Sequence, residues 1–226
     1  MNILPALRRR IPNLAGVVIF IFLIVHDCFS DDQFKIDKTN LDWAAAQYCE
    51  KSQDSLLTWE KLIRENNSES DFAKLDQVNR FFNRFEFISD YSHWGTRDYW
   101  ATPLEFIASG GGDCEDFSFA KYFTLKALGI SDKKLNLTYV KALQLNQAHM
   151  VLTYFASPGA EPLILDNLTD EIEPASTRSD LLPVYSFNAT GLWLAKQRGK
   201  GKLVGKSSKL ERWQSLLERM PKALIR

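Results

Sequence analysis

Residues 110–116 read Gly110-Gly111-Gly112-Asp113-Cys114-Glu115-Asp116, which places a cysteine directly after three glycines and between acidic side chains. The residues after it predict an amphipathic helix that begins at the cysteine. Because a helix N-terminus carries roughly half a positive charge, a thiol there can ionise below its free pKa of about 8.5. An inert, buried cysteine is the alternative. The apolar positions of the predicted helix, and the glycine that ends it, are Phe117, Ala120, Tyr122, Phe123, Leu125, Leu128 and Gly129.

Two downstream segments supply partners for a nucleophilic thiol. His149 opens a largely apolar run that predicts a strand, and the apolar stretch Leu163–Leu165 ends at Asp166. The separations of 35 residues (149 − 114) and 17 residues (166 − 149) suit neighbouring strands packed against one helix. A nucleophilic thiol needs a base and a third group that orients the base. We therefore take Cys114, His149 and Asp166 as candidate catalytic residues, with Asn167 as the alternative orienting group.

The remaining pattern predicts an α+β fold, in which a helix packs on an antiparallel sheet. Helical periodicity runs from residue 40 to 87, with a loop at 66–70 and Asp71 as a possible cap. Residues 91–108 are aromatic and resemble a loop, and His93 within them is expected to be structural. Strands are expected near residues 135–143, 150–155, 163–165 and 184–187. The predicted organisation is a signal peptide at 1–30, a helical lobe at 31–90, a catalytic core at 91–194 and a basic tail at 195–226.

The N-terminal segment predicts export. Three arginines, residues 8–10, precede an apolar run of 12 residues, Leu14 to Val25, which is shorter than the ~20 residues of a spanning helix. Cys28 and Ser30 stand at −3 and −1 of a plausible cleavage point, which is typical of a secretory signal peptide. An uncleaved anchor is the alternative, and it would also place the rest of the chain outside the cytoplasm.

Composition excludes several classes of protein. The formal net charge of the 226 residues is zero, which argues against nucleic acid as the main partner. No zinc-type spacing and no phosphate-binding glycine loop is present in the sequence. Cys49 lies in a helical pattern and is expected to be a small buried hydrophobe. In an oxidising compartment a Cys49–Cys114 disulfide is conceivable, but it would abolish the activity of Cys114.

The tail from residue 195 to 226 differs from the rest. It holds ten Lys/Arg and two Glu, a net charge of +8 (10 − 2). Residues 200–208 are expected to be a flexible lead-in to a last helix. That helix either presents a basic patch to an acidic partner or a membrane, or docks on the protein and leaves its basic face in solvent. Its predicted apolar face consists of Leu210, Trp213, Leu217 and Met220.

The carboxylates beside Cys114 can be interpreted in two ways. Asp113, Glu115 and Asp116 suit a helix N-terminus, where they would cap the helix and favour its dipole. They also suit a hard cation, since three carboxylates near a glycine turn can supply oxygen ligands to Ca²⁺. Such an ion would cancel their unfavourable effect on a thiolate.

Five short motifs carry a resemblance to a known family and lie between Trp94 and Trp193. They are Gly112-Asp113-Cys114-Glu115-Asp116, Ala120-Lys121-Tyr122, His149-Met150-Val151-Leu152, Leu165-Asp166-Asn167-Leu168 and Leu182-Pro183-Val184-Tyr185-Ser186-Phe187-Asn188. In this order they resemble the bacterial transglutaminase-like cysteine proteinases, and within them most closely the periplasmic proteases that release large adhesins.

The resemblance implies more than the residues alone do. It implies a papain-like core, a Cys-His-Asp triad, and dependence on Ca²⁺ with Asp113 and Glu115 as ligands. Asp116 matches the same motif and completes the candidate metal set. Trp94 is implied as a second oxyanion donor beside the Cys114 N–H. Arg178, Asp180 and Asn188 also fall in the matching region and are expected to maintain the fold.

The resemblance also implies a substrate and a partner. The substrate would be the N-terminal region of a large repeat adhesin, cut beside small residues such as paired alanines. The partner would be the periplasmic domain of an inner-membrane receptor for cyclic di-GMP, which sequesters the protease and so controls biofilm dispersal. A transglutaminase, which passes the acyl group to an amine, and a peptide-binding module without catalysis are the alternatives.

Overall fold

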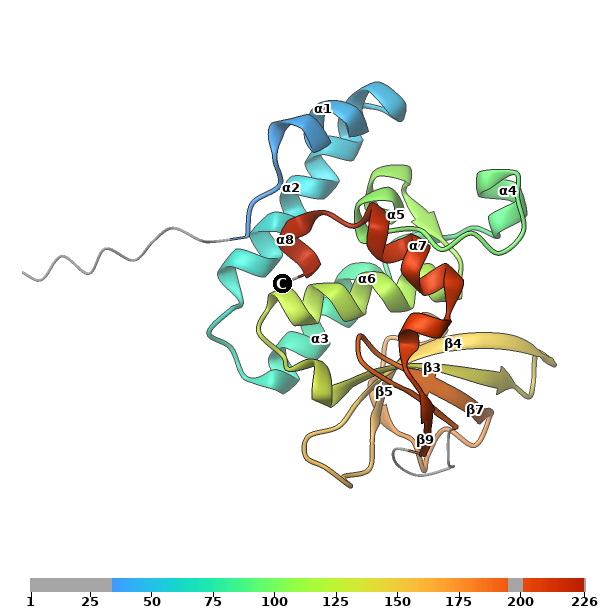
Figure 1. Ribbon diagram of the computed structural model, residues 1–226. Helices are drawn as coiled ribbons and strands as arrows, with labels where there is room; N and C mark the ends of the chain where they lie inside the picture. The colour runs from blue at the N-terminus through green and yellow to red at the C-terminus, as the bar shows by residue number, and fades with distance from the viewer. Residues whose placement is uncertain (1–33, 195–200, 226) are drawn as a thin grey trace, which may run out of the picture. The chain divides into compact units, whose positions relative to one another are not determined.

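The computed structural model describes residues 34–194 and 201–225 of the chain (Figure 1). The predicted signal peptide, residues 1–30, lies outside the described residues. Within the described ranges, no helix combines the length and hydropathy needed to cross a membrane.

Three helices come first: α1 (Lys38–Gln47), α2 (Glu50–Glu65) and α3 (Asp71–Phe82). The cap of α3 is Ser70, whose hydroxyl accepts from the Ala73 N–H at 3.3 Å, so the cap predicted at Asp71 is wrong by one residue. Asp71 is free to face the sheet because Ser70 takes over capping. There it accepts hydrogen bonds from Lys134 at 2.6 Å and Tyr154 at 2.7 Å.

Two short helices occupy the segment predicted to be an aromatic loop. They are α4 (Asp90–Trp94) and α5 (Pro103–Ser109), and α5 begins where Thr102 forms a capping box with Glu105 and a proline occupies the first turn. The loop prediction therefore missed a local start signal. Between α3 and α6 lies a parallel pair of two-residue strands, β1 (Glu86–Phe87) and β2 (Gly111–Gly112).

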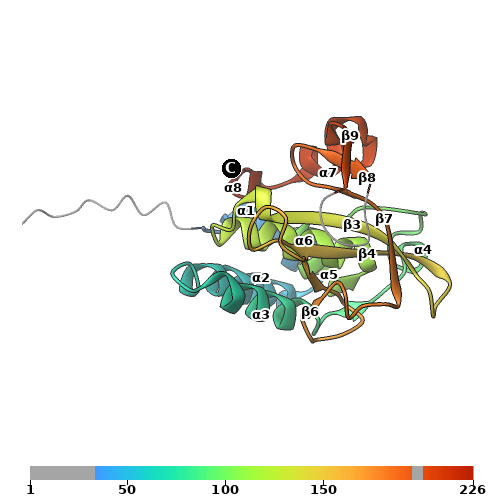
Figure 2. The same ribbon diagram turned by 90° about the horizontal axis from the view of Figure 1, so that it is seen from below.

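Helix α6 (Cys114–Ala127) lies at the centre of the described fold. Figure 1 shows it lying over one face of the sheet, and Figure 2 shows α2 and α3 on one flank and α7 on the other. Every residue from Asp116 to Leu125 is buried as a result. The helix was correctly predicted, but its amphipathic character was wrong, because protein surrounds it on several sides.

The sheet has the strand order β6-β5-β4-β3-β7-β8-β9, and each neighbouring pair is antiparallel. Its centre is a hairpin of two eight-residue strands that turns at Asn146, whose φ is 52°. A helical layer on an antiparallel sheet confirms the predicted α+β class. The strands are β3 (Leu135–Ala142), β4 (Gln147–Tyr154), β5 (Leu163–Leu165), β6 (Glu173–Pro174), β7 (Leu181–Phe187), β8 (Leu192–Leu194) and β9 (Lys202–Gly205).

Residues 201–225 form an ordered part of this fold. Strand β9 and a 3-10 helix, Ser207–Lys209, replace most of the predicted flexible lead-in. Helices α7 (Glu211–Arg219) and α8 (Lys222–Ile225) follow. Trp213 is fully buried, with its ring stacked 5.6 Å from that of Phe123 and set edge-on 5.4 Å from that of Phe187. Helix α7, which corresponds to the predicted last helix, is therefore docked through its apolar face.

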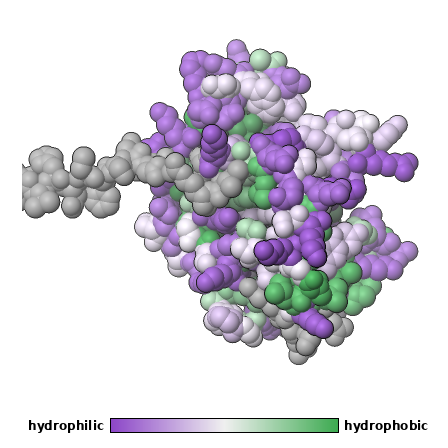
Figure 3. Space-filling view, viewed as in Figure 1, coloured by the Kyte–Doolittle hydropathy of each residue, from purple (hydrophilic) through white to green (hydrophobic). Residues whose placement is uncertain are grey.

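Segments of the predicted lobe, core and tail share one hydrophobic core, to which Trp59, Leu75, Phe123 and Trp213 all contribute. The boundaries predicted at residues 90 and 194 stay predictions. On the outside, Figure 3 shows an apolar patch at the β9 end of the sheet. Exposed apolar side chains in β8 and β9 are Leu194, Leu203 and Val204.

We expect Trp213→Ala to lower the free energy of unfolding by about 3–5 kcal/mol, because it empties the space between α6 and β7. Trp43→Ala is the matched control, since Trp43 is 36% exposed and its ring meets that of Tyr48 at the surface. The control should stay within about 1 kcal/mol of wild type. Urea unfolding followed by circular dichroism measures both. Equal effects of the two substitutions would show that α7 is not part of the core.

Candidate active site

The glycines before Cys114 fix where α6 begins. A Cβ on Gly111 would lie 2.1 Å from the Glu86 carbonyl oxygen, so only glycine allows β2 to pair with β1. A Cβ on Gly112 would lie 2.4 Å from a carboxylate oxygen of Asp116. The close approaches at these glycines are thus made by the protein's own backbone and by Asp116. It holds Cys114 at the first position of the helix.

The Cys114 thiol lies among acidic groups. Its Sγ donates to Glu115 Oε2 at 3.0 Å. Burial raises the pKa of the thiol, the charge and hydrogen bond of Glu115 and the charge of Asp113 raise it further, and a hydrogen bond with the Met150 backbone opposes them. The lowered thiol pKa expected at a helix N-terminus is therefore not found, because carboxylates and desolvation outweigh the helix dipole. Neutralising these carboxylates would remove one of the two effects that oppose the thiolate, and burial is the other.

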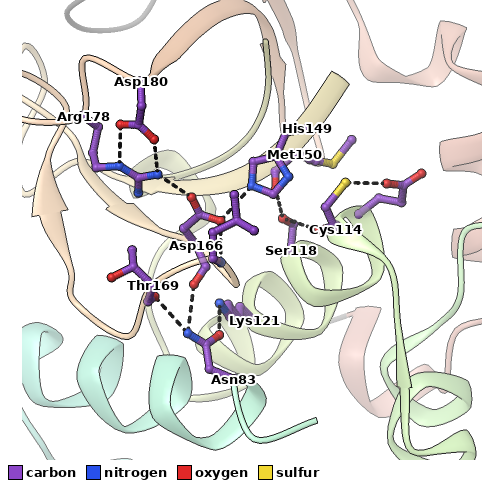
Figure 4. A network of polar contacts seen from close by, with 12 residues as sticks. Asn83, Cys114, Ser118, Lys121, His149, Met150, Asp166, Thr169, Arg178 and Asp180 are labelled. Carbon is purple, nitrogen blue, oxygen red and sulfur yellow. Dashed lines mark hydrogen bonds and ion pairs between the residues drawn. The ribbon is translucent and has the colours of Figure 1, made fainter. Parts of the chain in front are cut away.

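His149 lies on β4, one residue before Met150, and is buried. Its Nε2 lies 2.7 Å from Asp166 Oδ1, which leaves Nδ1 for the thiol. Figure 4 shows the imidazole between Asp166 and the Cys114 side chain. The Ser118 hydroxyl lies 2.9 Å from the Cys114 carbonyl oxygen and 3.0 Å from that of Met150, which ties the start of α6 to β4.

Asp166 follows β5 and its carboxylate is fully buried. Oδ1 accepts from His149 and from the Leu168 N–H at 3.1 Å, and Oδ2 accepts from Arg178 Nη2 at 2.7 Å. Burial acts to raise the pKa of Asp166, but the hydrogen bond and charge of His149, the Leu168 amide and Arg178 together lower it to about 2. Asp166, and not Asn167, thus contacts the imidazole.

A cleft of about 710 Å³ opens beside these groups. Cys114, His149 and Asn167 line it together with the aromatic rings of Tyr139 and Tyr185. Such a cleft is large enough for an extended peptide segment, and its aromatic walls suit apolar or small side chains.

Helix α7 supplies one charged residue of the cleft wall. Arg212 lines the cleft and pairs with Asp98 at 2.5 Å. Arg219, on the same helix, is anchored by Glu105 at 2.5 Å and by the Trp100 carbonyl oxygen. The predicted basic tail therefore contributes to the site rather than lying apart from it.

Trp94, the expected oxyanion donor, is not among the described residues that line the cleft; its ring packs 4.8 Å from that of Tyr99. His93 packs edge-on against Trp94 at 4.4 Å, as expected for a structural histidine. Cys49 is exposed at the N-cap of α2, so its predicted burial is wrong. Both Cys49 and Cys114 are free, which excludes the conceivable disulfide between them.

The acidic cluster is larger than the sequence indicated. Asp113 and Glu115 face the cleft, whereas Asp116 is fully buried and accepts from the Ala101 N–H at 2.7 Å and the Asp113 N–H at 3.4 Å. Asp90 and Asp98 join them from the segment around α4. Two sets of carboxylates have oxygens within 4.8 Å of one another: Asp90, Asp113 and Asp116, and Asp90, Asp98 and Glu115.

These carboxylates suit a hard cation. Oδ1 of Asp90 and Oδ1 of Asp113 are buried and have no hydrogen-bond partner among the described residues. Burial and the charges of Glu115 and Asp98 raise the pKa of Asp90 to about 6, although the Tyr99 amide acts against them. Burial and the neighbouring carboxylates also raise the pKa of Asp113 and that of Asp116. A divalent cation would relieve this repulsion and supply the missing partners.

Sequence reasoning missed four residues of the site. Asp90, Asp98 and Arg212 are far from Cys114 in the chain, and no spacing rule links them to it. Arg178 was interpreted as maintaining the fold, although it lies 12 residues after Asp166 (178 − 166) in the matching region.

Comparisons with known proteins identify the family. The model of the bacterial transglutaminase-like cysteine proteinases matches residues 35–199. A structure of Legionella pneumophila LapG is 44% identical, with a TM-score of 0.71, over 81% of this chain and 96% of that one. The EGTA-treated form gives the same identity, coverage and TM-score, and the calcium-bound form is 45% identical, with a TM-score of 0.70, over 82% and 100% of the two chains. A search of curated proteins found no match.

The predicted family and fold are thereby confirmed. A family model that covers most of the chain and LapG structures that align over about four-fifths of it lead to one conclusion: this chain belongs to the bacterial transglutaminase-like cysteine proteinases, and it is a LapG-like cysteine protease.

Proposed function

We propose that this protein is a calcium-dependent periplasmic endopeptidase that cleaves the N-terminal region of a large surface adhesin, with Cys114, His149 and Asp166 as its triad. The observation that carries the proposal is the 2.7 Å contact of His149 Nε2 with Asp166 in the wall of the cleft that also holds Cys114. This contact occupies Nε2 and leaves Nδ1 to act as the general base for the thiol.

The residues then have defined roles. Nδ1 of His149 takes the thiol proton, and the sulfur attacks a peptide carbonyl carbon. The Cys114 N–H, at the start of α6, donates to the resulting oxyanion. The imidazolium returns its proton to the leaving amine as the C–N bond breaks, which leaves a thioester. Water, deprotonated by His149, hydrolyses the thioester and frees the thiol.

Asp113, Glu115 and Asp116, together with Asp90 and Asp98, would hold the calcium ion. A bound Ca²⁺ supplies positive charge that stabilises the carboxylates as anions and removes their opposition to thiolate formation. Support comes from the orphaned oxygens of Asp90 and Asp113 and from the existence of a calcium-bound form of the similar LapG.

The proposed compartment and partner rest on the sequence. The basic and apolar segment at residues 1–30 would direct the chain to the periplasm. There the periplasmic domain of an inner-membrane cyclic di-GMP receptor would sequester the protease. Release of the protease would allow it to cut the adhesin and so detach the cells. The family resemblance supports both proposals.

Cleavage of the adhesin encoded with this protein in its source genome tests the function. Its N-terminal region is incubated with the protease, and products are examined for new N-termini and for amide crosslinks. A discrete new N-terminus beside small residues is the expected result. Crosslinked products would instead establish a transglutaminase, and intact substrate in the presence of folded protease and calcium would refute the substrate.

Calcium removal should have two effects. We expect EGTA to abolish cleavage and calcium add-back to restore it, because the thiol then faces uncompensated carboxylates. We also expect calcium to stabilise the fold by about 2.7 kcal/mol at a hundredfold excess over its Kd. Thermal unfolding with and without calcium measures the second effect independently of activity.

Asp113→Asn should remove the calcium-dependent shift in Tm, whereas the surface substitution Asp76→Asn should retain it. A calcium-dependent Tm shift that persists in Asp113→Asn would show that Asp113 caps the helix and is not a calcium ligand. Cleavage at the same rate with and without EGTA would support the protease activity and refute its calcium dependence.

A further inference from the structure

Arg178 donates a hydrogen bond to Oδ2 of Asp166, the carboxylate oxygen that does not contact His149. We propose that Arg178 is a positioning residue of this site: its guanidinium fixes the plane of the Asp166 carboxylate, and this in turn fixes the His149 imidazole. The inference rests on the proposed triad but concerns a residue that the triad does not include.

Three hydrogen bonds determine the orientation of the guanidinium. Arg178 Nη2 lies 2.7 Å from Asp166 Oδ2 and 2.9 Å from Asp180 Oδ2, and Nε lies 3.0 Å from Asp180 Oδ1. The fork to Asp180 is bidentate, which is the geometry that orients a planar guanidinium most strictly. Figure 4 shows Asp180, Arg178, Asp166 and His149 in one continuous chain of contacts.

Burial makes this chain rigid. The side chain of Arg178 is 7% exposed and that of Asp166 is fully buried, whereas Asp180 is 30% exposed. Water therefore competes little for the hydrogen bond between Arg178 and Asp166. Asp180 forms the outer end of the chain and anchors Arg178 at the surface.

A separate tether fixes the main chain of Asp166. Asn83 Nδ2 lies 2.9 Å from the Asp166 carbonyl oxygen, and Lys121 Nζ donates to Asn83 Oδ1 at 2.7 Å. Because Lys121 lies on α6, the helix that begins at Cys114 also holds the backbone of Asp166. Because the backbone of Asp166 is fixed, the remaining motion is rotation of its carboxylate. The hydrogen bond from Arg178 restricts that rotation.

The charges around Asp166 also favour this role. Lys121 faces it from α6, Asp170 lies on the segment after it, and Glu173 approaches Arg178 Nε at 3.9 Å from β6. Arg178 is the cation that contacts the Asp166 carboxylate directly among the described residues. Without it, Oδ2 would lose this donor while His149 and the Leu168 amide both contact Oδ1, so the plane of the carboxylate would no longer be held through both oxygens.

The test compares Arg178→Met, Arg178→Lys and Asp180→Asn with Arg80→Met, which removes an arginine from the exposed Arg80–Asp76 pair. The first measurement needs no substrate. The Nε2 proton of His149 is followed by NMR on protein labelled with ¹⁵N-histidine and assigned with His149→Gln. The second measurement is kcat and KM for adhesin cleavage.

In wild type and Arg80→Met we expect a strongly deshielded, slowly exchanging Nε2 proton. Arg178→Met should lose this signal to exchange while its amide spectrum stays dispersed, and its kcat should fall about 10- to 100-fold with KM unchanged. Arg178→Lys keeps the positive charge but cannot form the bidentate pair with Asp180. It should therefore recover part of the Nε2 proton signal and part of kcat. Asp180→Asn should give a smaller loss of both.

An Nε2 signal and kcat in Arg178→Met equal to those of Arg80→Met would overturn the proposal. If Arg178→Met does not fold, a folded Arg178→Lys with wild-type signal and wild-type kcat has the same consequence. Loss of the signal in Arg178→Met without any adhesin cleavage by wild type would uphold the positioning role and refute the proposed substrate. The two proposals therefore fail separately.

Discussion

Cys114→Ala should show no measurable cleavage, a fall in kcat on the order of 10⁵- to 10⁶-fold. The reason is that no neighbouring group can replace the sulfur as nucleophile. His149 is engaged by Asp166, and the Ser118 hydroxyl lies against the Cys114 and Met150 carbonyl oxygens. The fold should be retained, since among the described residues Glu115 is the side chain with which the Cys114 Sγ atom forms a hydrogen bond.

Cys49→Ala is the matched control. Cys49 is exposed at the start of α2, and its removal should leave kcat unchanged. Both proteins are assayed with calcium after their Tm values are compared with that of wild type. Residual cleavage by Cys114→Ala within tenfold of wild type would mean that another residue is the nucleophile.

The second large effect is expected from Asp166→Asn, which should lower kcat by about 10³- to 10⁴-fold. The carboxylate accepts from His149 through one oxygen and from Arg178 through the other. An asparagine has one acceptor oxygen, so either His149 or Arg178 faces an NH₂ group instead. The imidazole then loses its orientation or adopts the wrong tautomer, and Nδ1 is no longer available to take the thiol proton.

Asp76→Asn, which affects only an exposed i,i+4 pair with Arg80, is the control for a lost aspartate charge. Single-turnover kinetics at saturating substrate isolate the chemical step. A fall of less than tenfold in Asp166→Asn, in a protein with wild-type circular dichroism, would indicate that His149 is oriented by other contacts.

The sequence predicted the parts of this fold that local signals determine. Glycines before an acidic N-terminus located the start of α6, and apolar runs located β3, β4 and β5. The order of Cys114, His149 and Asp166 pointed to residues that the fold does bring together, since Cys114 and His149 line one cleft and Asp166 contacts His149. The glycine and apolar-run signals lie within a few residues of the features they predict.

The parts that failed depend on contacts between distant segments. The burial of α6 on several faces results from α3, the sheet and α7, which its own periodicity cannot reveal. The acidity of the thiol was misjudged because its burial where α6 packs against β4 raises the thiol pKa, in addition to the effect of the adjacent Glu115 and Asp113. Arg212 reaches the cleft from the tail because Trp213 docks the helix, and no motif links the two regions.

Whether Cys114 is activated in this cleft can be measured by competition between two thiols of the same chain. The protein, with calcium at neutral pH, is treated with limiting iodoacetamide, and the label at Cys114 and at Cys49 is quantified by peptide mass spectrometry. Exposure favours Cys49, and a hydrogen bond from Ser52 also lowers the pKa of its thiol. We predict that Cys114 is labelled first in wild type and that His149→Ala reverses the preference. Preferential labelling of Cys49 in wild type would contradict the proposed nucleophile.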